Sequence, residues 1–501
     1  MTGAFLALAV TIASLLALSP QALAASNESP AGEVPQHHRD LAHSGLYVTP
    51  ELTWETARHL HRDPRFQARL DGPVYAQPLY WSPADGKPVL IVATEQNLVY
   101  GLDPDTGNVI WKKSLGPPVP SSALPCGNID PLGITGTPVI DQRSGTLYLD
   151  AMVWVNRRPA HEIFALSTKD GSVLPRWPVD VAAALQAHGK TFLAQNQNER
   201  GALTIVGDRL YVPYGGHFGD CATYHGWVVG VSLRDPTQVS NWSTRGRGGG
   251  IWAPGGIVSD GKALYASTGN TMGARNWADG EAVIRLGLDL SHSQKPEDFF
   301  APANWRELDD EDLDLGGANP VLVTLPGATP SDLVLALGKD GKAYLLDRRR
   351  LGGIGGALAA KTVADGPIRT APAAFPGADG AYVVFQGSGA GCPAGHGGDL
   401  TAVKISRGAP PALAVIWCAR EHGRGSPIVT TTNGEANPIV WAVGAEGDNR
   451  LRGFRGDTGA VIFNGGGSAD AMSLVRRFTT LIAVGRHLYV AGDTSVYAFT
   501  Y

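Results

Sequence analysis

The stretch GGGIWAPGGIVSDGKALYASTGN, residues 248–270, carries chemically useful side chains at both ends of one small element. Its apolar runs GIV and ALYAS, on either side of the polar turn SDGK, predict a β-hairpin. The chain enters this hairpin through three glycines and Trp252, and leaves it through Gly269 and Asn270. Its place in a glycine loop sets Trp252 apart from tryptophans at strand ends, such as Trp111 and Trp417, which we expect to pack between strands.

Two further residues suit acid–base chemistry. Asp314 lies in the acidic run DDEDLDLGG, and a carboxylate can act as a general base or as a ligand of a hard cation. Lys339 lies in GKDGK, and an ammonium group can stabilise negative charge that develops during a reaction. Each also has an ordinary interpretation, because acidic runs are usually solvated loops and lysines are common in hairpin turns. Asn270 has one too, since asparagine after glycine is frequent in turns.

The loop YGGHFGDCATYHGW, residues 214–227, gathers polar side chains: His217, Asp220, Cys221, Tyr224 and His225. A metal site is one interpretation, although two histidines eight residues apart on an irregular loop are not diagnostic. The other interpretation is a loop tied by a disulfide.

The composition favours an all-β protein with a large buried core. The 501 residues include 64 glycines and 35 prolines, and only 17% are charged. The formal net charge is −5 and no basic block stands out, so nucleic acid and anionic membranes are not expected partners. A small molecule or another protein is expected instead.

The first residues, MTGAFLALAVTIASLLALSPQALAASNESP, resemble a secretory signal peptide. Residues 5–18 are apolar but short for a membrane span, and the A-x-A pattern at 22–24 predicts cleavage. No Lys or Arg precedes the apolar core, so a membrane anchor is the alternative. We predict a signal peptide at 1–24, a flexible leader at 25–50, and a periplasmic or secreted protein with no membrane span after cleavage.

One motif recurs through the chain, and its clearest copy is LVYGLDPDTGNVIW at 98–111. Seven weaker copies start near residues 162, 227, 282, 342, 399, 450 and 495, and a hairpin precedes each copy. Repeats of four strands predict a β-propeller, here with eight blades in one domain at 51–501. The eighth copy stops after its third strand, at Tyr501. We predict that RFQARL, residues 65–70, supplies the missing strand and closes the ring, because an open edge would remain otherwise.

The repeat predicts where the candidate residues lie. Residues before the first strand and after the second strand of a blade share one face, so Trp252 and Asn270 can reach one central cavity. Cys126 and Cys221 lie on that face as well, whereas Cys392 and Cys418 both belong to the sixth blade. These are the pairs we favour, although four cysteines allow three pairings.

The YGLDPDTGNVIW repeat resembles that of quinoprotein alcohol dehydrogenases, which are eight-bladed propellers with pyrroloquinoline quinone (PQQ) and calcium. The Gly-rich run, Trp, hairpin and TGN end resemble a segment of that family as well. This resemblance implies that Trp252 stacks on the quinone and that Asn270 helps to bind calcium. It further implies that Asp314 acts as general base for an alcohol or as a metal ligand, and that Lys339 hydrogen-bonds the quinone.

Three departures from the family favour an alternative, a non-catalytic binding propeller with a degenerate quinone pocket. The third-blade loop lacks the family's calcium-binding Glu, and His217 or Asp220 lies nearest to its position. Only Cys126 matches the family's pair of adjacent cysteines. A nearby arginine for a quinone carboxylate is missing, and Asp130 stands close to its position, so Arg200 or Arg247 would have to compensate.

Overall fold

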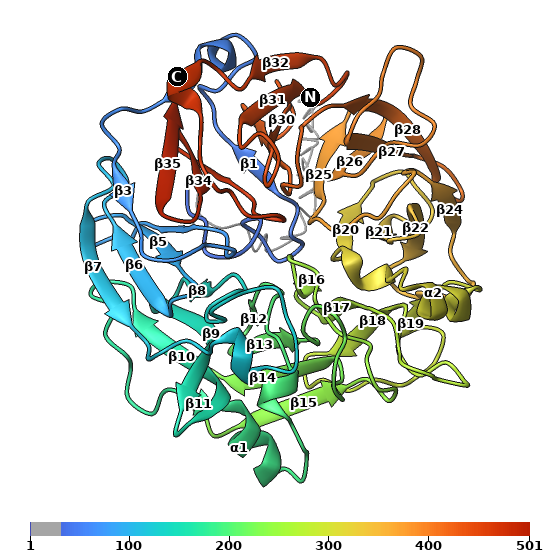
Figure 1. The fold of residues 1–501 in the computed structure, drawn as a ribbon. Helices are drawn as coiled ribbons and strands as arrows, with labels where there is room; N and C mark the ends of the chain where they lie inside the picture. Colours follow the sequence, from blue (N-terminus) through green and yellow to red (C-terminus); the bar gives the residue numbers. More distant parts are fainter. Residues whose placement is uncertain (2–31) are drawn as a thin grey trace.

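The computed structural model describes residue 1 and residues 32–501, and within this range eight antiparallel sheets form a closed ring (Figure 1). Each sheet is one blade, and in blades 1 to 7 the four core strands run from the hub outward in chain order. In blade 8 the outermost strand comes from the N-terminal part of the chain. The predicted all-β, eight-bladed propeller is therefore confirmed. Apolar clusters within and between the blades form the core.

Blade 1 consists of β4 (Leu79–Trp81), β5 (Val89–Ala93), β6 (Leu98–Leu102) and β7 (Val109–Ser114), and blade 2 consists of β8 (Val139–Asp141), β9 (Thr146–Val155), β10 (Arg158–Ser167) and β11 (Val179–Asp180). Blade 3 consists of β12 (Thr204–Val206), β13 (Arg209–Tyr214), β14 (Trp227–Ser232) and β15 (Val239–Ser243), and blade 4 consists of β16 (Val258–Ser259), β17 (Ala263–Thr268), β18 (Ala282–Gly287) and β19 (Phe299–Ala301). A short strand, β23 (Gly353–Ile354), adds to the outer edge of blade 4 parallel to β19.

Blade 5 consists of β20 (Val321–Thr324), β21 (Asp332–Leu337), β22 (Lys342–Asp347) and β24 (Ala359–Thr362), and blade 6 consists of β25 (Ala373–Gly377), β26 (Gly380–Gln386), β27 (Leu400–Ser406) and β28 (Ala412–Ala419). Blade 7 consists of β29 (Ile428–Thr431), β30 (Ile439–Val443), β31 (Leu451–Arg455) and β32 (Val461–Asn464), and the inner strands of blade 8 are β33 (Ile482–Val484), β34 (His487–Ala491) and β35 (Ser495–Thr500). The helices are α1 (Val181–Ala187), α2 (Trp305–Glu311) and the 3-10 turns η1 (Thr56–His59), η2 (Ser121–Ala123), η3 (Ala194–Asn196), η4 (Leu315–Gly317) and η5 (Ser468–Asp470). None of the helices in the described part of the chain has the length and apolar character to span a bilayer.

The turn of the repeat is stabilised by its own side chains. In DPDTG, an oxygen of the Asp103 carboxylate accepts hydrogen bonds from the backbone N–H and the hydroxyl of Thr106. Gly107 follows with a φ of 76°, which glycine adopts without strain. These bonds set the hairpin between the third and fourth strands of a blade.

The tryptophan of the repeat ties one blade to the next in blades 1 and 6. The Trp111 indole packs on Gly101, where a Cβ atom would lie 2.2 Å from the ring, and its N–H donates to the Thr168 carbonyl of blade 2. Trp417 makes the same contact from blade 6, because its N–H donates to the Gly456 carbonyl of blade 7. These two tryptophans therefore pack between blades, as expected.

The N-terminal strand closes the ring as predicted. Within residues 65–70, β3 (Ala68–Arg69) pairs antiparallel with β35, with Ala68 opposite Val496. A second short strand, β2 (His61–Arg62), pairs with the end of β35. The first and last parts of the chain thus share blade 8, which removes an open sheet edge.

The prediction of a flexible leader at 25–50 is wrong for the residues that the structure describes there. Residues 33–49, which we call the hub segment, contact the innermost strands of five blades. Val34 bridges to β4, the carbonyls of Pro35, Leu41 and Ser44 accept from β8, β16 and β25, and β1 (Leu46–Val48) pairs parallel with β29. The sequence of the hub segment shows no periodic pattern of apolar residues that would predict burial, yet His37, His38 and His43 are buried. The predicted signal peptide and residues 25–31 lie outside the described range.

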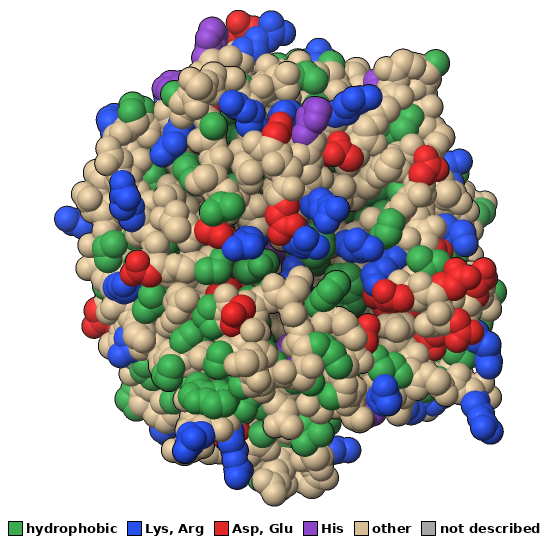
Figure 2. Space-filling model, in the orientation of Figure 1, with side chains coloured by type: hydrophobic (Ala, Val, Ile, Leu, Met, Phe, Trp, Pro, Cys, Tyr) green, Lys and Arg blue, Asp and Glu red, His purple; other side chains and the backbone are tan. Residues whose placement is uncertain are grey.

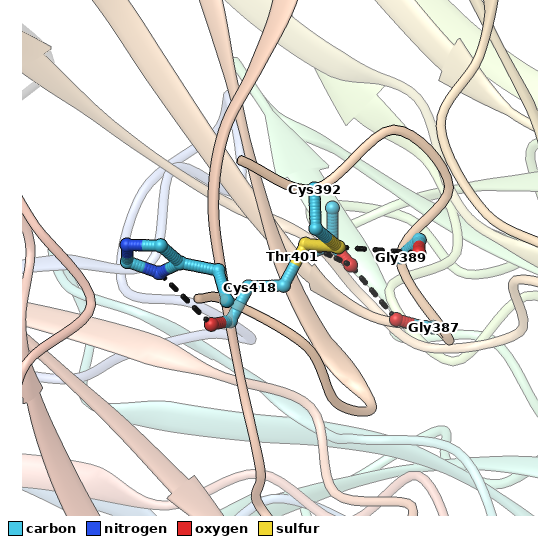
Figure 3. Close-up of a disulfide and its surroundings, with 6 residues drawn as sticks. Gly387, Gly389, Cys392, Thr401 and Cys418 are labelled. Carbon is cyan, nitrogen blue, oxygen red and sulfur yellow. Dashed lines mark hydrogen bonds between the residues drawn. A yellow bond between two sulfur atoms is a disulfide. The ribbon is translucent and has the colours of Figure 1, made fainter. Parts of the chain in front are cut away.

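Both disulfides follow the favoured pairing. Cys126 bonds to Cys221, and Cys392 bonds to Cys418. The second bond lies within blade 6, where Cys418 is on β28 (Figure 3). Beside it the Thr401 hydroxyl donates to the Gly387 carbonyl, so the loop between β26 and β27 is fixed to the sheet.

Candidate functional site

An ion pair between Asp314 and Lys339 lies at the centre of the candidate site. Asp314 precedes η4, before the first strand of blade 5, and Lys339 follows the second strand, β21. The Lys339 ammonium lies 2.5 Å from one Asp314 carboxylate oxygen, and both side chains are more than 90% buried. The other carboxylate oxygen accepts the backbone N–H of Asn270 at 2.7 Å. The three residues are thus joined across blades 4 and 5.

Trp252 completes this group. The Lys339 ammonium lies 5.3 Å from the centre of the indole ring, within the range of a cation–π interaction. Gly317, beside Lys339, lies close to the far edge of the same ring. The structure therefore brings together all four residues, Trp252, Asn270, Asp314 and Lys339, whose roles in binding and catalysis stay predictions.

The glycine of the TGN end is required by this packing. A Cβ atom at Gly269 would lie 2.5 Å from a carboxylate oxygen of Asp314 and 3.2 Å from the indole nitrogen of Trp252. The absence of a side chain at position 269 lets the Trp and the carboxylate approach the same backbone. This close approach explains why the hairpin ends in Thr-Gly-Asn.

Gly269→Ala should destabilise the protein by about 1–3 kcal/mol, the usual cost of overpacking a filled site. The added methyl group forces Asp314 or Trp252 to move, because neither contact can be kept at the distances above. Urea unfolding measures the change. Gly366→Ala is the matched control, since a Cβ atom there meets no atom within 4 Å. Equal stability of the two variants would contradict the packing argument.

Electrostatics keep Lys339 charged and leave a nearby glutamate neutral. Burial lowers the pKa of Lys339, but the charges of Asp314 and Asp312 outweigh it and the pKa is raised. Burial, followed by the charge of Asp314, raises the pKa of Glu281 well above its usual value. Glu281 accepts the backbone N–H of Leu315 with one oxygen, and its other oxygen has no hydrogen-bond partner among residues 32–501. Sequence reasoning missed this residue, which looks like part of a turn in ADGEA.

The residues present do not form a calcium site. Both carboxylate oxygens of Asp314 are already engaged, by the Asn270 N–H and by the Lys339 ammonium. Within residues 32–501, no group of three His, Cys, Asp or Glu side chains is arranged to hold a metal ion. Calcium needs six to eight oxygen ligands, so the predicted metal role of Asn270 and Asp314 does not fit this arrangement.

The histidines of the third-blade loop face backbone carbonyls. His217 is buried with Nε2 3.0 Å from the Gln195 oxygen, and burial lowers its pKa to about 4. Nδ1 of His225 lies 3.0 Å from the Thr244 oxygen. The Cys126–Cys221 disulfide ties this loop to the loop at 116–136. This geometry favours the disulfide-tied loop over a metal site.

The sequence analysis considered Asp130, Arg200 and Arg247 for the surroundings of a quinone carboxylate. In the structure these three residues lie in different places. Asp130 is exposed and accepts the Ser121 backbone N–H within its own loop. Arg247 is exposed, with its guanidinium against the sulfur of Met272. Arg200 lies over two rings, 5.8 Å from the centre of Tyr75 and 4.9 Å from that of Phe478. Of the two arginines, only Arg200 lines the central cavity.

The central cavity is narrow. It has room for about one water molecule, and His37 of the hub segment lines it together with Gln77 and Thr480. The hub segment therefore forms the floor of the cavity. The cavity as it stands is too small for a flat ligand of three rings.

Comparison with known proteins places the fold in a recognised group. No protein-family model and no curated protein sequence matches the chain. Among solved structures, quinohemoprotein alcohol dehydrogenase from Comamonas testosteroni has a TM-score of 0.63 at 15% identity over 95% of this chain and 81% of that one. A europium-containing methanol dehydrogenase has a TM-score of 0.63 at 14% identity over 95% and 99%. BamB from Moraxella catarrhalis has a TM-score of 0.50 at 16% identity over 88% and 98%. The chain thus has the eight-bladed propeller fold found in quinoprotein alcohol dehydrogenases, as the repeat predicted.

Proposed function

We propose that this chain is a PQQ-dependent oxidoreductase that acts on an alcohol-type substrate. One observation supports the proposal most strongly: Trp252, Asn270, Asp314 and Lys339 come from two blades and meet in one group. The chemistry of the group suits a planar anionic quinone, because it combines an indole face with a buried ammonium.

Each side chain has a defined task in this proposal. When bound, PQQ supplies a two-electron acceptor. Trp252 provides the stacking surface, and Lys339 places positive charge where negative charge develops. Asp314 accepts the hydroxyl proton of the alcohol as general base, and the Asn270 N–H fixes its orientation. Lys339 has to leave the indole face for stacking, which its long side chain allows. No step is assigned to calcium, because the residues do not fit it.

Export belongs to the same proposal. Both cysteine pairs are oxidised to disulfides, which persist in the periplasm or outside the cell. This supports the predicted signal peptide at residues 1–24.

A non-catalytic propeller that binds a ligand or a protein at this face is the second candidate. Two observations favour it: the general base is already neutralised by Lys339, and the hub segment fills the channel below the site.

Titration of the purified protein with PQQ, in the presence of either calcium or a chelator, separates the two candidates. The proposed enzyme should quench tryptophan fluorescence on binding PQQ and then reduce an artificial dye with primary alcohols. Asp314→Asn should lower the dye-reduction rate at least about 100-fold, as loss of a general base does. Asp379→Asn is the control, because Asp379 is an exposed carboxylate that pairs with Lys404. If the protein shows no fluorescence quenching and no dye reduction, the function is that of a binding propeller.

A further inference from the structure

Two segments carry the candidate base and its hydrogen-bond partner, and a third segment contacts both of them. The TGN end of β17 supplies Asn270, and the residues before η4 supply Asp314. Residues 279–281, the DGE turn that leads into β18, return along the TGN end. Glu281, the last residue of this turn, is fully buried and bonds to both of the other segments.

Glu281 joins the two segments through different groups. Its backbone N–H donates to the Gly269 carbonyl at 3.0 Å, and one of its carboxyl oxygens accepts the Leu315 backbone N–H at 2.6 Å. Beside these bonds, the Asp314 carboxylate accepts the Asn270 N–H. The two connections run in parallel between the same pair of segments, so the position of Asp314 depends on both of them.

The packing around these bonds is tight. A Cβ atom at Gly316 would lie 2.5 Å from the backbone of Thr268, and a Cβ atom at Gly280 would lie 2.5 Å from the methyl group of Thr271. Glu281 itself has a φ of 49°, which is uncommon for a residue other than glycine. Backbone strain of this kind collects at functional sites, where the surrounding contacts maintain it.

Glu281 makes this connection as a neutral acid. Asp and Glu side chains gather over α2, the helix that precedes η4 (Figure 2). Burial and the charges of Asp314 and Asp309 raise the pKa of Glu281, and the Leu315 N–H and the charge of Lys339 only partly oppose them. A second carboxylate here would repel Asp314 and compete for the Lys339 ammonium. The neutral acid leaves that ion pair intact.

We propose that Glu281 is the positioning residue of the candidate base: through Leu315 and Gly269 it holds the Asp314 carboxylate where it accepts the hydroxyl proton of the alcohol. Glu281 acts through these neighbours and takes no part in the proton transfer itself. This inference rests on the proposed oxidoreductase function. Because a small displacement of a catalytic group lowers the rate steeply, loss of the connection should lower kcat and leave KM for the alcohol nearly unchanged.

Three substitutions at this position test the role, with dye reduction by the purified full chain loaded with PQQ as the measurement. Glu281→Gln keeps a neutral acceptor for the Leu315 N–H and should keep kcat within about two-fold of the wild type. Glu281→Leu removes the acceptor and should lower kcat at least about ten-fold. Glu281→Asp withdraws the carboxyl group by one methylene and should lower kcat as well, so the test stands even if the leucine variant fails to fold.

Glu421 provides the matched control, because it has the same local arrangement between blades 6 and 7. It is fully buried, one carboxyl oxygen accepts the Gly425 N–H at 3.1 Å, and the other has no hydrogen-bond partner among residues 32–501. Glu421→Leu should lose stability in urea but keep the kcat of the wild type. A comparable loss of kcat in Glu421→Leu and Glu281→Leu would overturn the positioning role. Wild-type kcat in Glu281→Leu or Glu281→Asp, or equal losses in Glu281→Gln and Glu281→Leu, would overturn it too.

Urea unfolding separates failure of this inference from failure of the proposed function. If the wild type reduces no dye, a double-mutant cycle still reports whether Glu281 fixes Asp314. The cycle combines Asp314→Asn with Glu281→Leu, or with Glu281→Asp if the leucine variant does not fold. Positioning predicts that replacing Glu281 costs less stability once Asp314 has been replaced. Additive losses would show that the two side chains are independent and would overturn the inference.

Discussion

Lys339→Met should lower the free energy of unfolding by about 3–5 kcal/mol, the usual result of removing one partner from a buried ion pair. The side chain of Asp314 is only 4% exposed and loses its single charged partner in this variant. The hydrogen bond from the Asn270 N–H remains but does not balance a full charge. Urea denaturation at neutral pH, followed by circular dichroism, measures the change.

The reciprocal substitution, Asp314→Asn, should lower the free energy of unfolding much less than Lys339→Met does. In Asp314→Asn, Lys339 keeps an ion pair with Asp312, whose side chain is 64% exposed and whose carboxylate lies 2.7 Å from the ammonium. The double variant Lys339→Met with Asp314→Leu should recover most of the lost stability, because no unpaired charge is left behind. Lys404→Met, which breaks a pair with Asp379, whose side chain is 80% exposed, is the control. Equal losses in the two single variants would contradict the asymmetry.

The fold was predictable because its determinants are local. The DPDTG turn of the clearest copy returns in part, for example as GDTG at 456–459, and the strand pattern returns along the chain, so one clear copy identifies the weaker ones. The missing strand of blade 8 followed from counting strands, since a ring cannot leave one sheet incomplete. The group around Trp252 was predictable for the same reason: a position relative to a strand fixes the face on which a residue lies.

The remaining features depend on contacts between distant segments. The hub segment resembles a polar leader, and its burial results from backbone hydrogen bonds with strands 40 to almost 400 residues away. Glu281 is buried because η4 folds over it.

The hub segment carries three buried histidines that must stay neutral. The rings of His37 and His38 stack with centres 4.3 Å apart, and His43 lies 5.4 Å from His37. Burial lowers the pKa of His38 to about 4 and that of His43 to about 3. The elements packed on the cluster supply uncharged groups, such as Gln77 and Thr480. A proton on these rings would therefore have no compensating charge.

His43→Leu should stabilise the protein at pH 5 by about 2 kcal/mol relative to the wild type, and change little at pH 7.5. The pKa of His43 is lower in the folded state than in the unfolded chain, so the unfolded chain binds more protons below about pH 6.5 and stability falls as the pH falls toward 3. Leucine removes this effect, and neither ring nitrogen of His43 makes a hydrogen bond of normal geometry with residues 32–501 that would be lost. Comparing each variant with the wild type at both pH values cancels the opposite effect of Glu95, whose pKa burial raises to about 7. His59→Leu, at an exposed ring, should show no such pH dependence, and the same pH dependence in both variants would mean that the hub segment is not held by neutral histidines.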